Sequence, residues 1–377
     1  MKKIVCLFIF VVTALLFSVN VSAQSQSSLT DELGIDTTSV NDNLTPEVRD
    51  FIEENDISID NTDSMTRITP SQVIEYLWES FKDKLTYPLK ILASLIAVIL
   101  ISVLVSTSED SFTNKSLSGI FGVISVLISV GIISEAVSAC INTASEALTS
   151  GSRFMIGYVP AFAGIAASSG SITSATAYNM LVVLVSQGAT QIFVNIIVPV
   201  LSLCMALGIV EAINPDFRLS VITEGIKKGV TFMIGLIMTV FIGLMSLQSI
   251  VGASADTLGV KAAKYMVANW VPFVGGAIAD TYTTVKHSLG LLRGGAGFFG
   301  IAAIFVMIVP PLLEIIAMRL IIIAADIISD ILDVSQIRIL LKNTSWIMSI
   351  ALSVLMCFSV MFIISTTILM LVGLNVS

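Results

Sequence analysis

The sequence is poor in histidine, cysteine and charged residues, and these shortages exclude several kinds of site. His287 is the only histidine, and no group of Cys and His residues has metal-ligand spacing. The four cysteines are isolated in or beside apolar segments, which argues against a disulfide framework. No glycine-rich loop follows the phosphate-binding pattern. We therefore predict no metal and no cofactor.

Charge is scarce enough to exclude a soluble globular protein. Only 12% of the residues are charged, 55% are hydrophobic, and the mean hydropathy is +0.95. An ordinary soluble domain has roughly a quarter of its residues charged. Several apolar segments reach the ~20 residues needed to cross a bilayer, whereas the alternation of a membrane β-barrel is absent. The composition predicts an all-α polytopic membrane protein with about six to eight transmembrane helices.

The N-terminus has the pattern of a secretory signal peptide over residues 1–23. Lys2 and Lys3 precede an apolar segment, and a small-residue cleavage site ends at Ala23. An uncleaved first helix is the alternative. Cleavage is favoured because a polar segment follows at once, and this predicts that residues 24–87 are extracytoplasmic.

Residues 24–87 are strongly acidic. The polar tract 24–44 is predicted to be disordered, and two short amphipathic helices should follow it. Thr45-Pro46 is predicted to begin the first, and the capping box Thr69-Pro70-Ser71-Gln72 the second. The apolar face of the second helix could pack on a partner or lie on the membrane surface. The negative charge does not suit nucleic acid or an anionic lipid surface.

The membrane region contains a pattern that returns after 112 residues. Ile192-Phe193-Val194 and Pro199 reappear as Ile304-Phe305-Val306 and Pro311. This offset predicts a tandem duplication, with coincidence between similar apolar helices as the alternative. The resulting boundaries are a first span and link (88–116), membrane repeat 1 (117–228), membrane repeat 2 (229–340) and a C-terminal span (341–377).

Four prolines are predicted to break helices within these repeats, because proline removes a backbone hydrogen bond. They are Pro160, Pro199, Pro272 and Pro311. Residues 117–140 would then form one span, residues 142–153 an amphipathic connector, and the segment after Tyr158 a re-entrant element or a surface loop.

Basic residues predict the topology only in part. Arg218, Lys227 and Lys228 form a link that should be cytoplasmic, which makes the two repeats parallel. Lys261, Lys264, Lys286 and Arg293 then lie on the wrong side, and inverted repeats stay open.

The densest charges within the apolar part are Glu314, Arg319, Asp326, Asp330 and Asp333, and the first three are the candidate site. Ionisable residues within spans are costly and therefore mark candidate sites. We predict a polar pathway or an internal interface there. The alternative is a helix that leaves the membrane after Ala325, with its acids in water and Arg319 reaching the surface. Paired acids on facing spans are not evident, so we do not predict an enzyme.

Four runs of residues resemble the stage III sporulation protein AE family of endospore-forming bacteria. They are the runs 153–164, 269–276, 291–297 and 310–314. The resemblance covers nearly the whole chain, and its specificity comes from the order in which the runs occur. None of them is a recognised catalytic signature, so no catalytic residue is transferred.

The resemblance implies a multi-pass component of the channel between mother cell and forespore, located in the mother-cell membrane and needed for late forespore development. Its expected partners are membrane lipid and other proteins of the sporulation operon, including a secretion-type ATPase and ring-forming proteins. Nucleic acid is not expected, and a homo-oligomer stays open. Composition and repeats alone would favour a secondary transporter built from two broken-helix repeats.

Overall fold

The computed structural model describes residues 38–55, 57, 70–107, 115–217, 219–270 and 275–372. The predicted signal peptide and Pro272 lie outside these residues. All described regular elements are helices, and six candidate spans are long and apolar enough to cross a membrane. The prediction of an all-α polytopic membrane protein is therefore confirmed.

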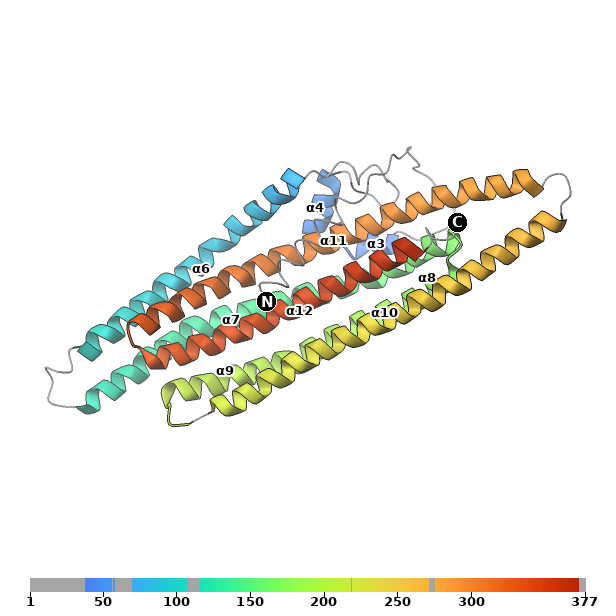
Figure 1. Ribbon diagram of the computed structural model, residues 1–377. Coiled ribbons are helices and arrows are strands. Elements are labelled where there is room, and N and C mark those ends of the chain that lie inside the picture. Colours follow the sequence, from blue (N-terminus) through green and yellow to red (C-terminus); the bar gives the residue numbers. More distant parts are fainter. Residues whose placement is uncertain are drawn as a thin grey trace.

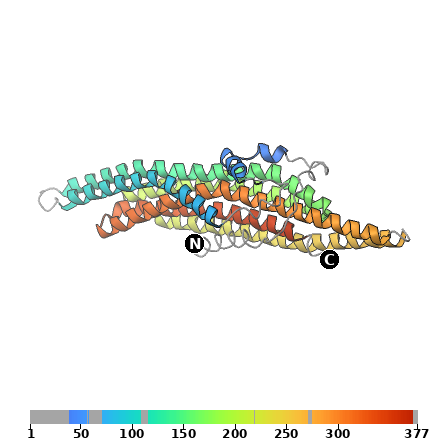
Figure 2. The same ribbon diagram turned by 90° about the horizontal axis from the view of Figure 1, so that it is seen from above.

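The long helices form an elongated bundle in which successive spans run in opposite directions (Figure 1). The bundle is also elongated, but thinner, when it is seen from above (Figure 2). The 54 residues of α7 correspond to roughly 80 Å at 1.5 Å per residue, well above a hydrocarbon core of about 30 Å. The elements in order are α3 (Thr38–Asp42), α4 (Pro46–Glu54), α6 (Pro70–Thr107), α7 (Lys115–Ser168), α8 (Ile172–Ile192), the π-helical turn η2 (Phe193–Ile197), α9 (Val198–Ile213), α10 (Ser220–Trp270), α11 (Gly275–Ile331) and α12 (Ser335–Val372).

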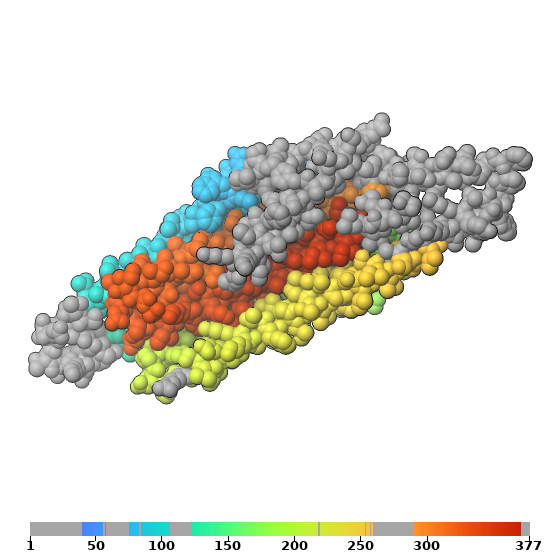
Figure 3. Space-filling model, in the orientation of Figure 1, coloured from blue at the N-terminus to red at the C-terminus, as the bar shows by residue number. Residues whose placement is uncertain are grey.

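Helices α11 and α12 form the centre of the bundle. They pack on each other and on α7, while α6 flanks α11 and α9 flanks α12. In the apolar spanning segments of α11 and α12, 67% and 72% of the residues are buried inside the bundle. The corresponding shares are 22% for α6 and 17% for α10. Helices α6 and α10 therefore lie at opposite edges of the bundle, and Figure 3 shows α10 beside α12 on one face.

The helix starts predicted at Thr45-Pro46 and Pro70 are confirmed, because Thr45 is the N-cap of α4 and α6 begins at Pro70. The second helix is not short, however. It continues through Pro88 to Thr107 and includes the first predicted span. Disorder was also the wrong expectation for residues 38–42, because α3 packs against α7 and buries Val40 completely.

A separate span, connector and broken element were predicted where the structure has the single helix α7. The connector residues Ala144, Ala147 and Leu148 are buried. Their helical spacing forms an apolar stripe facing the bundle, which favours continuation of the helix.

Helices α7 and α10 run in the same direction, as do α8–α9 and α11 (Figure 1). If the duplication is real, its two units are therefore parallel. The duplication itself stays a prediction.

Candidate functional site

The helix breaks predicted at Pro160 and Pro311 are wrong, because both prolines lie inside continuous helices. A proline inside a helix costs about 3 kcal/mol. Val159 and Phe162 on either side of Pro160 are buried, so packing of the surrounding turns offsets that cost. Membrane helices also tolerate proline where neighbouring groups satisfy the freed backbone.

Pro199 distorts its helix without ending it. The five residues Phe193–Ile197 form a π-helical turn, and the Val198 N–H donates to the Phe193 carbonyl. The wider turn precedes the proline and carries the chain directly from α8 into α9. Residues 172–213 therefore form one distorted span.

Glu314 connects three helices. Its Oε2 lies 3.0 Å from Lys84 Nζ of α6, and Thr143 Oγ1 of α7 donates to its Oε1 at 3.3 Å. The Glu314 side chain is 23% exposed and that of Lys84 43%. The contact therefore lies at a partly buried interface among α6, α7 and α11, and its partners are far away in the sequence.

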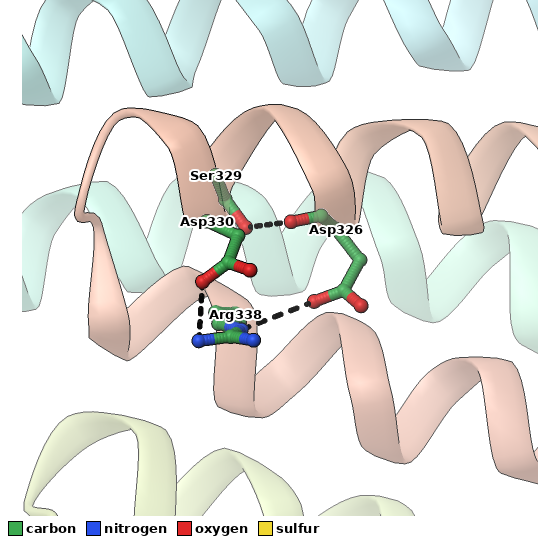
Figure 4. Close-up of polar contacts among 4 residues, drawn as sticks. All are labelled: Asp326, Ser329, Asp330 and Arg338. Carbon is green, nitrogen blue, oxygen red and sulfur yellow. Dashed lines mark hydrogen bonds and ion pairs between the residues drawn. The ribbon is translucent and has the colours of Figure 1, made fainter.

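Arg319 and Asp326 are not part of the Glu314 contact. Within the described part of the chain, Arg319 forms no ion pair with Glu314 or Asp326. Asp326 instead lies 3.9 Å from Arg338 Nε at the turn into α12, and Arg338 also pairs with Asp330 (Figure 4). Ser329 Oγ donates to the Asp326 carbonyl at 2.8 Å (Figure 4). These groups hold the α11–α12 turn and do not join Glu314 in one polar pathway.

Besides the cluster around Glu314, a second polar cluster lies where α8 begins. It was not predicted from the sequence. Asp256 of α10 is 6% exposed and accepts the backbone N–H groups of Thr173 and Ser174 at 2.8 and 3.1 Å. Gln248 Nε2 of α10 donates to the Ser174 carbonyl at 3.0 Å. Because the first N–H groups of a helix lack intrahelical partners, Asp256 caps α8 from another helix.

Arg293 of α11 completes this cluster. It is 2% exposed, and its Nη1 donates to Ser171 Oγ at 3.1 Å. Among the residues that the structure describes, none forms a hydrogen bond with its Nε or Nη2. The negative charge of Asp256 acts on Arg293 and opposes the cost of burying its charge. The sequence feature that could have revealed this cluster is an arginine and an aspartate, each isolated in apolar surroundings.

Aromatic rings fill the bundle between these two clusters. Tyr158 of α7 stacks on Phe154 and Phe162, at centroid distances of 5.2 and 5.4 Å, and approaches Phe362 of α12. Its hydroxyl donates to the Ala296 carbonyl of α11 at 3.0 Å. The segment predicted to be re-entrant is therefore the buried contact between α7 and α11.

The two polar clusters bracket an uncharged part of α11. Residues 294–313 carry no charged side chain, with Arg293 before them and Glu314 after them. At about 1.5 Å per residue, this segment is about 30 Å long, the thickness of a bilayer's hydrocarbon core. The arrangement serves helix packing and membrane embedding, and no group of three or more metal-binding side chains occurs among the described residues.

Comparison with known families agrees with this architecture. The family model of stage III sporulation protein AE matches residues 55–373, which include all six candidate spans. The chain belongs to the stage III sporulation protein AE family. A curated member from Bacillus subtilis (strain 168) is 22% identical over 284 residues, covering 75% of this chain and 71% of that protein. No solved structure matches.

Two of the runs that resemble the stage III sporulation protein AE family meet in the bundle. Tyr158 belongs to the run 153–164, and Ala296, which accepts its hydrogen bond, belongs to the run 291–297. Glu314 ends the run 310–314 and contacts α6 and α7. These three runs therefore contribute helix contacts around α11.

We expect Lys84→Glu to lower spore yield because it places two acids at the α6–α11 contact, 3.0 Å apart in the native pair. The double variant Lys84→Glu with Glu314→Lys should restore most of the yield by reversing the pair. The measurement is heat-resistant spore counts at equal protein level. Wild-type counts for Lys84→Glu, or no recovery in the double variant, would contradict an interaction between these side chains.

Proposed function

We propose that this chain is an integral membrane component of the transenvelope channel between mother cell and forespore, and that it is needed for late forespore development. The observation that carries the proposal is the family match over residues 55–373. The six candidate spans support a membrane-embedded role.

The proposal places the chain in the mother-cell membrane around the forespore, with residues 24–87 on the extracytoplasmic side. Its partners would be membrane lipid, the secretion-type ATPase, the ring-forming proteins of the same operon and further copies of itself. Helices longer than a bilayer is thick, such as α7 and α11, provide surface beyond the membrane for such contacts.

The alternative, a secondary transporter, has less support. It depended on broken helices at matching positions, whereas Pro160 and Pro311 lie in continuous helices. A cavity of about 380 Å³, including open space at its mouth, lies beside η2 and is lined almost entirely by apolar side chains such as Phe193 and Ile237. Such a lining does not fit a polar or charged substrate.

The test is deletion of the gene in its own sporulating host. We expect engulfment to be completed and late forespore gene expression to fail, with full recovery on complementation. An affinity-tagged chain should co-purify the ATPase and ring-forming proteins from sporulating cells. Normal sporulation of the deletion strain would refute the proposal. Transport of a solute by the purified chain alone in liposomes would favour the transporter.

A further inference from the structure

The apolar cavity beside η2 is elongated along the helices. Its lining comes from α7, α8, η2, α10 and α12. On α8 and η2 the lining residues extend from Ala189 to Ile197, which is about 12 Å at 1.5 Å per residue. On α12 they extend from Val354 to Met361, about 10 Å. The cavity therefore has the shape of a short cleft between α8, α10 and α12.

The π-helical turn accounts for the space at this place. Phe193 and Ile197 are the first and last residues of η2, are 1% and 2% exposed, and both line the cavity. Regular helices fill the space between them by packing ridges of side chains into grooves. A π turn interrupts that regular spacing, and such turns are frequent at functional sites. The distortion before Pro199 thus leaves a gap against α10 and α12.

The lining selects an apolar occupant. Apart from the Cys357 thiol and the Met361 thioether, every lining side chain is a hydrocarbon. A buried water needs two to four polar partners, whereas apolar cavities stay dry and take up apolar molecules. If the space stayed empty, the lining atoms would lose dispersion contacts. A hydrocarbon occupant restores those contacts and needs no polar partner.

The mouth of the cavity opens onto an apolar surface. The lining residues Ile192 of α8 and Ile237 of α10 are half-buried, so the cavity is not enclosed. Beside Ile237 on the outer surface of α10, Leu236 and Val240 are 49% and 50% exposed. Figure 3 shows α10 beside α12 on this side of the bundle.

The helices around the mouth are uncharged over long segments. No charged side chain occurs in α8–α9, α10 and α12 over residues 172–210, 229–255 and 343–372. Each segment is longer than the ~20 residues that cross a bilayer. The surroundings of the mouth are therefore suited to lipid wherever along these helices the membrane lies.

We propose that this cavity binds the hydrocarbon tail of a membrane lipid. Lipid tails are the hydrocarbon that surrounds a membrane-embedded chain, and a flexible tail fits a cleft that is elongated along the helices. The hydrophobic effect does not separate the cavity from the bilayer, since both are apolar, so the tail is held by its close contacts with the lining. The inference depends on membrane embedding and not on the channel function.

The test uses the purified full-length chain in vesicles of phosphatidylglycerol and phosphatidylethanolamine. A trace of phospholipid carries a photoreactive diazirine near the end of one tail, and mass spectrometry locates the cross-linked residues. We expect label on Phe193 and Phe358, which are 1% and 3% exposed and are therefore shielded from lipid at the outer surface. Leu236 and Val240 should be labelled by the surrounding lipid and serve as the reference. No label on Phe193 and Phe358 would overturn the inference.

The substitution Ala189→Leu narrows the cavity. It should lower the label on Phe193 and Phe358 about fivefold or more relative to Leu236, because the larger side chain occupies the space of the tail. Ala177→Leu is the matched control and should leave the labelling unchanged, since Ala177 is also a half-buried alanine of α8 but does not line the cavity.

Cys357→Phe fills the cavity from α12 and decides if Ala189→Leu does not accumulate. Unchanged label on Phe193 in the variant that accumulates would mean that the tail arrives by another route, which contradicts the inference. A small arene that carries a diazirine is tested in parallel. Label on Phe193 from the arene and not from the phospholipid would identify a small apolar ligand in place of a lipid tail. Each of these results leaves the channel function to be decided by the deletion strain.

Discussion

The substitution Asp256→Leu should lower the free energy of unfolding by about 1–3 kcal/mol, the cost of leaving a buried hydrogen-bond donor without its acceptor. It removes the negative charge that acts on the buried Arg293 and also the side chain that accepts the Thr173 and Ser174 N–H groups. The lost cap alone is worth about 1 kcal/mol. The measurement is chemical unfolding of the purified protein in detergent micelles, followed by tryptophan fluorescence.

Asp330→Leu is the control, because it removes an aspartate whose contact with Arg338 lies at the surface, where the Asp330 side chain is 51% exposed. Exposed pairs contribute about 0–1 kcal/mol. The double variant Asp256→Leu with Arg293→Leu should recover part of the loss, because the positive charge of Arg293 then no longer stays buried without the opposing charge of Asp256. If Asp256→Leu costs no more than Asp330→Leu, the buried cluster does not hold α8 against α10 and α11.

The sequence predicts the class of fold well because apolar segments of bilayer length are a local property. It also predicts the first residues of α4 and α6 from cap chemistry. The length of α7 was not predictable in the same way. Proline and small polar residues weaken a helix locally, whereas burial of Ala144, Leu148 and Phe162 against other helices decides that it continues.

The candidate site was predictable only where a single residue carried the signal. Glu314 stands out as an acid in an apolar run, but its partners Lys84 and Thr143 are brought to it by the packing of α6 and α7. The pairing of Asp326 with Arg338 depends on the geometry of the α11–α12 turn. Arg293 was visible in the sequence, yet it was interpreted as a topology signal. The role of Asp256 follows from the contact between α10 and the start of α8, which no local pattern reveals.

The substitution Gly300→Ala should destabilise the bundle by about 3 kcal/mol, at the upper end of typical overpacking. A Cβ at this position of α11 would come within 2.8 Å of Tyr158 Cε2 and closer still to the Cζ and hydroxyl oxygen. Tyr158 cannot move aside cheaply. It is 1% exposed and stacks on Phe154 and Phe162, and its hydroxyl donates a hydrogen bond to the Ala296 carbonyl. Unfolding in detergent, measured as for Asp256, checks the loss.

Gly243→Ala on α10 is the control. It measures the intrinsic effect of replacing glycine by alanine in a helix, without the steric overlap that arises at Gly300. A Cβ there meets nothing within 4 Å, so the exchange should stabilise α10 by up to about 1 kcal/mol. The decisive variant is Gly300→Ala combined with Tyr158→Leu. Because the shorter side chain removes the ring atoms, the double variant should be less destabilised than the sum of its parts. Strict additivity, or a Gly300→Ala protein as stable as the wild type, would show that α7 and α11 can separate at Tyr158 without loss.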